Sequence, residues 1–141
     1  MPTKSERDAL QACLAHCAKQ EPLQYIFGEV EFLDVKLLSD KRVQIPLPKT
    51  ECLVEWVITQ LLKQSPDHLP ESRNILGLGT RSVAIATALV KRFSMSYILA
   101  VDQSSSALEI ARLNAEYNQV NNVQLRNFRL VFIHRSKEPR V

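Results

Sequence analysis

An alternation of short apolar segments with amphipathic ones, between residues 74 and 125, most constrains how this chain can fold. Strands that are buried on both faces are continuous apolar runs, and segments of helical period connect such strands when they are parallel. The alternation therefore predicts a parallel sheet with right-handed helical crossovers. The predicted strands are residues 74–78, residues 97–101 and a third that begins at Val123 and Leu125, and the predicted helices are residues 83–93 and 106–114.

The first half of the chain has a different pattern. It predicts a helix at residues 5–19, a short turn and a hairpin at 23–38, an extended segment at 43–48, an amphipathic helix from Glu51 to Leu62 and a loop at 65–74. Trp56 is expected to pack against the core from the second of these helices. In the second half, Ser106 and Glu109 fit a capping box at the start of the last predicted helix.

These elements together define an α/β fold, namely one half of a doubly wound domain preceded by a helix and a hairpin. Residues 130–133 could add a fourth strand beside the first strand, whose apolar edge would otherwise be exposed. The predicted divisions are a helix at residues 1–22, a hairpin and extended linker at 23–48, the α/β half-domain at 49–126 and a basic tail at 127–141.

Composition and charge narrow the function. A chain of 141 residues, 45% of them hydrophobic, is long enough for one domain with a core. No run approaches the roughly 18 apolar residues of a membrane span, and Glu6 and Asp8 argue against a leader, so we expect a cytoplasmic protein without membrane contacts. The net charge is +3, but residues 126–141 hold five bases and one acid, and the rest sums to −1. This charge distribution excludes a nucleic-acid-binding protein with a basic surface over its folded part. We interpret the basic tail as the solvated end of a monomer.

The three cysteines are an odd number, which suits a reducing compartment. Cys13, His16 and Cys17 fall on one face of the first predicted helix, and a metal site there would need a further ligand. No other cluster of cysteine and histidine supplies that ligand. We therefore favour helix packing for these side chains and expect no metal site.

Two features fall at the carboxyl ends of predicted parallel strands, where ligands bind in such sheets. One is the turn at residues 77–82 (GLGTRS), which leads into a helix, and the other is Asp102 at the end of the next strand. Glycine lets a ligand approach the backbone, a helix N-terminus offers N–H donors, and an acid one strand away binds ribose hydroxyls. The pairing predicts bound adenosine, although a plain strand-to-helix turn explains two glycines about as often.

Four longer segments are more specific than the turn and the acid. In these segments the chain resembles the release-factor glutamine N5-methyltransferases (the HemK/PrmC family), which use S-adenosylmethionine. The similar segments are EPLQYIFGEVEF at residues 21–32, VQIPLPKTECLVEWV at 43–57, ILGLGTRSVAIATAL at 75–89 and AVDQSSSALEIARLNAEYNQVNNV at 100–123. Their order and spacing also agree with the family, and the similarity extends from Ser5 to about Leu125.

The resemblance implies a partial Rossmann-like S-adenosylmethionine-dependent methyltransferase domain, preceded by a helix and a β-hairpin linker. It also implies an activity, the methylation of the glutamine in the GGQ motif of peptide chain release factors, and a release factor as partner. The cofactor-binding residues that it points to are Gly77, Gly79, Thr80, Ser82 and Asp102. Gly77 stands where the family has an aspartate, and the other four match.

The chain also departs from the family pattern. No Asn-Pro-Pro-Tyr sequence occurs in it, so we assign no catalytic residue. The similarity stops near Arg126, as a shifted reading frame or a truncated gene would produce, and we expect an inactive copy. In the linker, Leu47 replaces a family arginine and Lys49 replaces an acid.

The cofactor turn is altered too, because Arg81 and Val83 stand where the family has glycines. A side chain at a position that requires a positive φ costs about 1 kcal/mol. The charge of Arg81 would face a cationic sulfonium, and the branched Val83 would crowd the close approach that glycine allows. Together we expect a loss of about 3 kcal/mol in binding, which is about a hundredfold.

Two alternatives remain open. The hairpin and the IPLP segment at residues 45–48 could bind a release factor without methyl transfer. The turn with Asp102 also resembles a dinucleotide-binding fold, against which Ser82 counts because that fold has a third glycine there.

Overall fold

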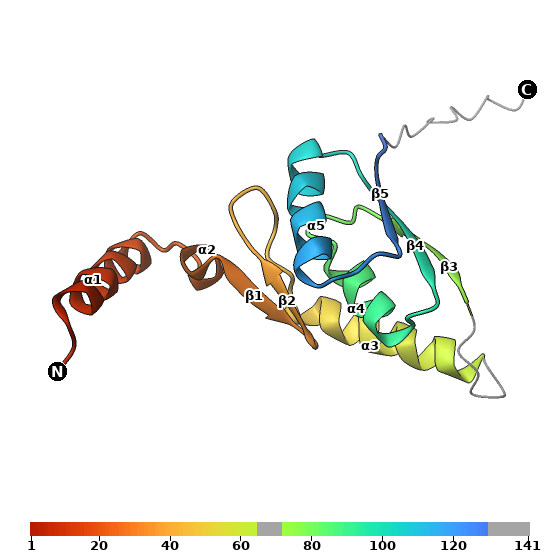
Figure 1. Ribbon diagram of the computed structural model, residues 1–141, viewed down its shortest axis with the longest axis horizontal. Coiled ribbons are helices and arrows are strands. Elements are labelled where there is room, and N and C mark those ends of the chain that lie inside the picture. Colours follow the sequence, from red (N-terminus) through yellow and green to blue (C-terminus); the bar gives the residue numbers. More distant parts are fainter. Residues whose placement is uncertain (65–71, 130–141) are drawn as a thin grey trace, which may run out of the picture.

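The computed structural model describes residues 1–64 and 72–129 (Figure 1). The predicted fourth strand at 130–133 and most of both the predicted loop at 65–74 and the predicted basic tail lie outside these residues. The elements are α1 (Lys4–Ala18), α2 (Leu23–Phe27), β1 (Glu29–Phe32), β2 (Val35–Leu38), α3 (Pro48–Lys63), β3 (Asn74–Leu78), α4 (Ala84–Arg92), β4 (Tyr97–Asp102), α5 (Ser105–Tyr117) and β5 (Val123–Asn127).

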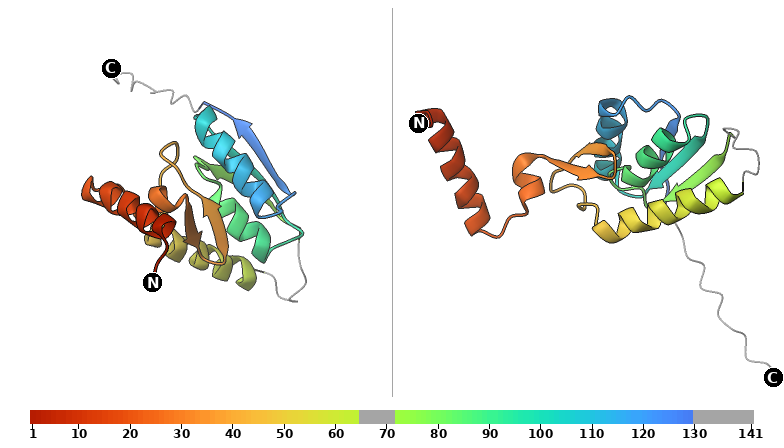
Figure 2. Two further views of the ribbon diagram at one scale, coloured as in Figure 1. Left: turned by 60° about the vertical axis from the view of Figure 1, so that its left-hand side comes forward. Right: turned by 90° about the horizontal axis from the view of Figure 1, so that it is seen from below.

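The predicted parallel sheet is present. Strands β3, β4 and β5 are hydrogen-bonded in that order, with Gly77 opposite Ala100 and Ala100 opposite Leu125. Helices α4 and α5 are the crossovers, and they lie with α3 and the β1–β2 hairpin on one face of the sheet (Figure 2). The predicted α/β fold is therefore confirmed.

One core joins the hairpin to the sheet. The hairpin contributes Phe32, Val35 and Leu37, which are fully buried although they precede the sheet by some forty residues in sequence. They pack with side chains from α3, α4, β4 and α5; the remaining buried members are Val54, Val83, Ala84, Ala86, Ala88, Leu89, Val90, Ile98, Ala100, Ala111 and Val120. The linker hairpin is thus part of the domain core.

Helix α3 corrects one expectation. Trp56 does not pack against the core, because its side chain is 61% exposed. The buried residue of this helix is Val54, and two residues further along an α-helix lie about 200° around its axis. The face that packs contains Val54, Val57 and Ile58, so Trp56 falls on the opposite side.

The start of α5 corrects another. The helix begins one residue before the predicted one, and its N-cap is Ser104, whose hydroxyl accepts a hydrogen bond from the Ala107 N–H. Ser106 instead lies inside the helix, with its hydroxyl 3.0 Å from that of Ser104. The predicted capping box of Ser106 and Glu109 was therefore wrong.

Helix α1 stands at one end of the molecule, beyond α2 and the hairpin (Figure 1). Thr3 and Glu6 form a capping box at its start, but the helix buries none of its residues. Cys13 is half-buried and Cys17 is exposed, so the packing that we favoured for this face is slight in the described residues. His16 pairs with Glu21, and no group of three or more metal-ligating side chains occurs in the described part of the chain.

None of the helices in the described ranges is long and apolar enough to cross a membrane.

Candidate functional site

The turn that follows β3 is bent by three residues with positive φ. Gly79 has φ 68°, Arg81 has φ 49° and Val83 has φ 64°. The Thr80 N–H donates to the Val101 carbonyl at 3.0 Å, which fastens the turn to β4, and the Val83 N–H donates to the Thr80 carbonyl at 2.8 Å. Glycine adopts this conformation freely, whereas for Arg81 and Val83 it is unfavourable by roughly 1–2 kcal/mol each.

The side chain of Val83 points into the core, away from both cavities beside this turn. It is 0% exposed, belongs to the core and lines neither of the two cavities described below. Burial of a valine side chain stabilises by about 1.5–3 kcal/mol, which offsets its backbone strain. The expectation that Val83 crowds a ligand was therefore wrong, because the left-handed φ directs the side chain into the core.

Asp102 lies at the end of β4 with its carboxylate held by two backbone groups. Oδ2 accepts a hydrogen bond from the Arg81 N–H at 2.8 Å, and Oδ1 accepts one from the Ser104 N–H at 2.9 Å. The residue is only 8% exposed. A carboxylate has about four lone-pair sites, so each oxygen retains capacity for one further donor. The turn after β3 and the end of β4 are thus joined through a fixed acid.

A cavity of about 420 Å³ lies beside this acid, within the usual size range of small-molecule sites. Its wall includes the exposed Phe128, whose N–H donates to the Asp102 carbonyl at 2.9 Å and so places the aromatic ring one strand away from the acid. The full lining is Arg42, Val43, Gly79, Arg81, Val101, Asp102, Gln103, Ser104, Ala107 and Phe128. We call this space the acid cavity.

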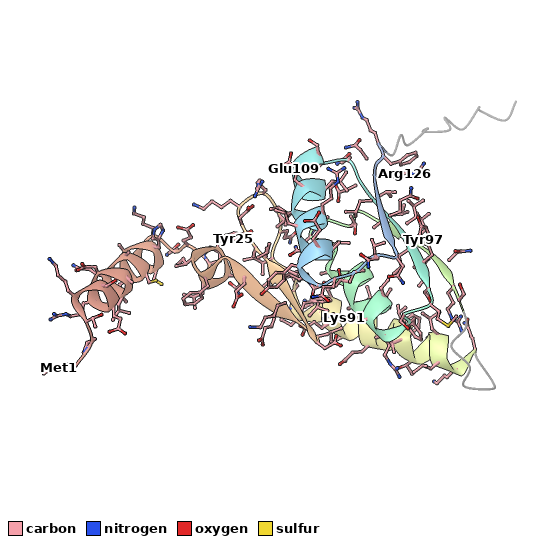
Figure 3. All side chains as sticks on the ribbon, viewed as in Figure 1. Met1, Tyr25, Lys91, Tyr97, Glu109 and Arg126 are labelled. Carbon is pink, nitrogen blue, oxygen red and sulfur yellow. The ribbon has the colours of Figure 1, made fainter. Side chains whose placement is uncertain are left out.

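The loop after β2 closes one side of the acid cavity. Arg42 donates to both carboxylate oxygens of Asp40 and lies 3.4 Å from the carboxylate of Glu109 on α5, which Figure 3 labels. The hydrogen bonds from Arg42 hold the pKa of Asp40 below its ordinary value. The charge of Arg42 is thus neutralised where it meets the cavity.

A second cavity of about 280 Å³ lies on the other side of the turn, against the linker. It is lined by Gln44, Ile45, Pro46, Leu47, Thr50, Leu53, Gly79, Thr80, Arg81, Ser82, Ala84 and Ile85. We call it the linker cavity. Gly79 and Arg81 line both cavities, and the Arg81 guanidinium donates to the side-chain carbonyl of Gln44, which lines the linker cavity.

Four of the five predicted site residues line these cavities: Asp102 the acid cavity, Thr80 and Ser82 the linker cavity, and Gly79 both. Gly77 lies inside β3 and lines neither. A Cβ atom there would come no closer than 3.9 Å to the backbone of Ala100, which is ordinary contact, so space does not require glycine at this position.

Sequence reasoning missed Gln44 and Phe128. Phe128 directly follows β5, and the rule that ligands bind at the carboxyl ends of parallel strands could have found it. No such rule was available for Gln44, because it approaches the turn from the linker, 37 residues away in sequence from Arg81.

Comparison with solved structures shows the fold. The chain matches the N-terminal domain of human METTL16 with a TM-score of 0.58 and 16% identity, covering 84% of this chain and 46% of that one. It matches human methyltransferase 10 domain containing protein with a TM-score of 0.54 and 18% identity, covering 87% and 55%. The chain therefore has part of the Rossmann-like fold of the S-adenosylmethionine-dependent methyltransferases.

Comparison with curated proteins is more particular. The chain is 37% identical to the release factor glutamine methyltransferase of Flavobacterium psychrophilum over 79% of its own length and 38% of the relative. It is 37% identical to that of Coxiella burnetii over 84% and 40%, and 44% identical to that of Lactococcus lactis over 73% and 36%. No protein-family model matches. The chain is therefore a homologue of the release factor glutamine methyltransferases that spans about two fifths of their length.

Proposed function

We propose that the acid cavity binds the adenosine part of S-adenosylmethionine and that this chain is the cofactor-binding portion of a release factor glutamine methyltransferase. The observation that supports the proposal best is the fixed carboxylate of Asp102. It lies at the carboxyl end of β4 in a cavity of about 420 Å³, with one acceptor position left on each oxygen. Two vicinal ribose hydroxyls are the donors that such a carboxylate suits.

The remaining walls fit the rest of a nucleoside. Phe128 offers an aromatic face to a base, and Gly79 has no side chain to obstruct a ligand that passes over the turn. Because Gly79 and Arg81 line both cavities, a ligand with its base and ribose in the acid cavity reaches the linker cavity across these two residues. We assign the amino-acid part of the cofactor to that side.

The methyl acceptor follows from the relatives. Their name makes a release factor glutamine the acceptor, and we extend this partner to the present chain. S-adenosylmethionine, when bound, supplies an electrophilic methyl group. Residues 1–141 contain no Asn-Pro-Pro-Tyr sequence, and we assign them ligand binding and positioning, with no residue in contact with the reacting amide.

Calorimetric titration of the purified chain tests the assignment, with S-adenosylmethionine and its demethylated product as ligands. We expect saturable binding of at least one of them, and Asp102→Asn should weaken it about tenfold or more, since a charged hydrogen bond contributes about 1.5–3 kcal/mol. Asp34→Asn, an exposed acid in the hairpin turn, is the matched control and should leave binding unchanged.

Two outcomes contradict the proposal. One is the absence of heat with either ligand up to about millimolar concentration, from a chain whose circular dichroism shows that it is folded. The other is binding that Asp102→Asn does not change. Saturable fluorescence titration with NADH in place of these ligands would favour the dinucleotide alternative.

A further inference from the structure

Arg81 brings an unpaired positive charge to the junction of the two cavities. Its guanidinium is exposed, and its hydrogen-bond partner there, the side chain of Gln44, is neutral. Within residues 1–64 and 72–129, none of the ion pairs includes Arg81. Arg42, which also lines the acid cavity, differs in this respect, because Asp40 and Glu109 neutralise it.

The backbone fixes where this charge is. The Arg81 N–H is bound to Asp102 at 2.8 Å, and the flanking Thr80 is bound on both sides, through its N–H to Val101 and through its carbonyl to Val83. The Cα of Arg81 therefore cannot move away without breaking one of the two contacts that hold the acid. The contact with Gln44 holds the guanidinium on the side of the linker cavity, while Arg81 lines both cavities.

We infer that Arg81 makes this site select the neutral thioether S-adenosylhomocysteine over the cationic sulfonium S-adenosylmethionine. The inference rests on the proposed function. The two ligands share the adenosine and the amino-acid ends, and they differ only in the transferred methyl group and the positive charge that it places on sulfur. The sulfur joins the two ends, so in a ligand that spans both cavities it lies at the junction, beside Arg81.

The magnitude follows from the exposure of the guanidinium. Two like charges a few ångströms apart at a solvated surface repel by an amount that corresponds to about tenfold in affinity, and the neutral thioether escapes this repulsion. Any attraction between Arg81 and the carboxylate of the amino-acid end acts equally on both ligands and does not discriminate. Because exposed charges are screened by salt, the preference should shrink as ionic strength rises.

The consequence is a site that is occupied by the product of methyl transfer when product and cofactor are present at equal concentrations. Family glycine at this position would place no charge against the sulfonium. Arg81 is thus a specificity-determining residue of the binding site.

Competition calorimetry with the two ligands tests the inference on four proteins. In the unaltered chain, S-adenosylhomocysteine should bind about tenfold more tightly than S-adenosylmethionine. Arg81→Gln should bring the ratio of the two dissociation constants close to one, by improving the affinity for the sulfonium. Arg81→Lys, which keeps the charge, should preserve the ratio, and so should Arg92→Gln, which removes an arginine from the far end of α4.

The outcomes separate the two proposals. Equal affinities in the unaltered chain, or a ratio that Arg81→Gln leaves unchanged, overturn the inference while Asp102-dependent binding keeps the proposed function intact. Binding of neither ligand to the folded chain overturns both. A ratio that falls with salt in the unaltered chain, and not in Arg81→Gln, is the further signature of a charge effect.

Discussion

The two faces of the β3–β4–β5 sheet differ sharply although the same strands build them. On one face Ile98 is 1% exposed and Ala100 is fully buried, beneath the helices and the hairpin. On the opposite face Leu76 is 59% exposed and Leu78 is 57% exposed. Helices α3, α4 and α5 and the hairpin lie on the other side of the sheet (Figure 2). Within β3, Ile75 packs against the core and its neighbour Leu76 is exposed.

The difference shows what an apolar strand does and does not specify. A sheet with one solvated face alternates apolar and polar residues, whereas NILGL at β3 and YILAV in β4 are apolar at nearly every position. Such strands are typical of sheets that are buried on both faces. Which face is covered in the described residues depends on the handedness of the crossovers, which puts α4 and α5 on the same side.

The largest expected effect tests the covered face. Ile98→Ala removes a fully buried side chain at the centre of the core and should lower the free energy of unfolding by about 2–5 kcal/mol. Urea denaturation followed by circular dichroism measures it. A loss below about 1 kcal/mol would mean that this face is not tightly packed in solution.

A buried side-chain amide, that of Asn114, links the elements that cover the same face of the sheet. Asn114 Oδ1 accepts the Leu38 N–H at 2.6 Å, and Nδ2 donates to the carbonyls of Leu38 and Ser82 at 3.2 and 3.1 Å. It thereby joins the hairpin, α5 and the turn after β3. Asn114→Ala leaves these backbone groups without partners and should cost about 1–3 kcal/mol.

The control for this variant is Asn118, the C-cap residue of the same helix. Asn118 donates to the Lys36 carbonyl at 2.8 Å, but the bond is exposed, so water replaces it and Asn118→Ala should cost less than Asn114→Ala. If urea denaturation gave equal losses in the free energy of unfolding for the two variants, the buried hydrogen bonds of Asn114 would not contribute more than the exposed one of Asn118.

The sequence predicts much of this arrangement. The strands at 74–78 and 97–101 and the helix at 83–93 agree with the structure to within a residue or so, because their hydrophobic periods are unambiguous. Asp102 and the turn after β3 meet because parallel strands end at one edge.

Other features depend on information that local pattern lacks. Trp56 is apolar and aromatic, yet the angle around α3 leaves it exposed. The bond from Asn114 to Leu38 spans 76 residues, and hydropathy carries no sign of it. The orientation of Val83 follows from a positive φ, which becomes visible only once the turn is built. Misses of this kind concentrate where tertiary contacts override local preference.

The smallest expected effect tests the exposed face. Leu76→Thr introduces a β-branched residue of high strand propensity and removes an apolar side chain that is mostly in contact with water. It should change the free energy of unfolding by no more than about 0.5 kcal/mol, in contrast to Ile98→Ala on the other face. Urea denaturation of both variants in parallel makes the comparison direct.

The same variant also distinguishes a bare surface from a covered one. Exposed apolar strand edges and faces promote association. Leu76→Thr should therefore raise the highest concentration at which size-exclusion chromatography still shows a monomer. A loss of about 2 kcal/mol or more on Leu76→Thr would contradict the difference between the faces, since only a packed side chain costs that much to remove. If that loss grew with protein concentration, a second copy of the chain would be the cover, because the stability of an oligomer depends on concentration and that of a monomer does not.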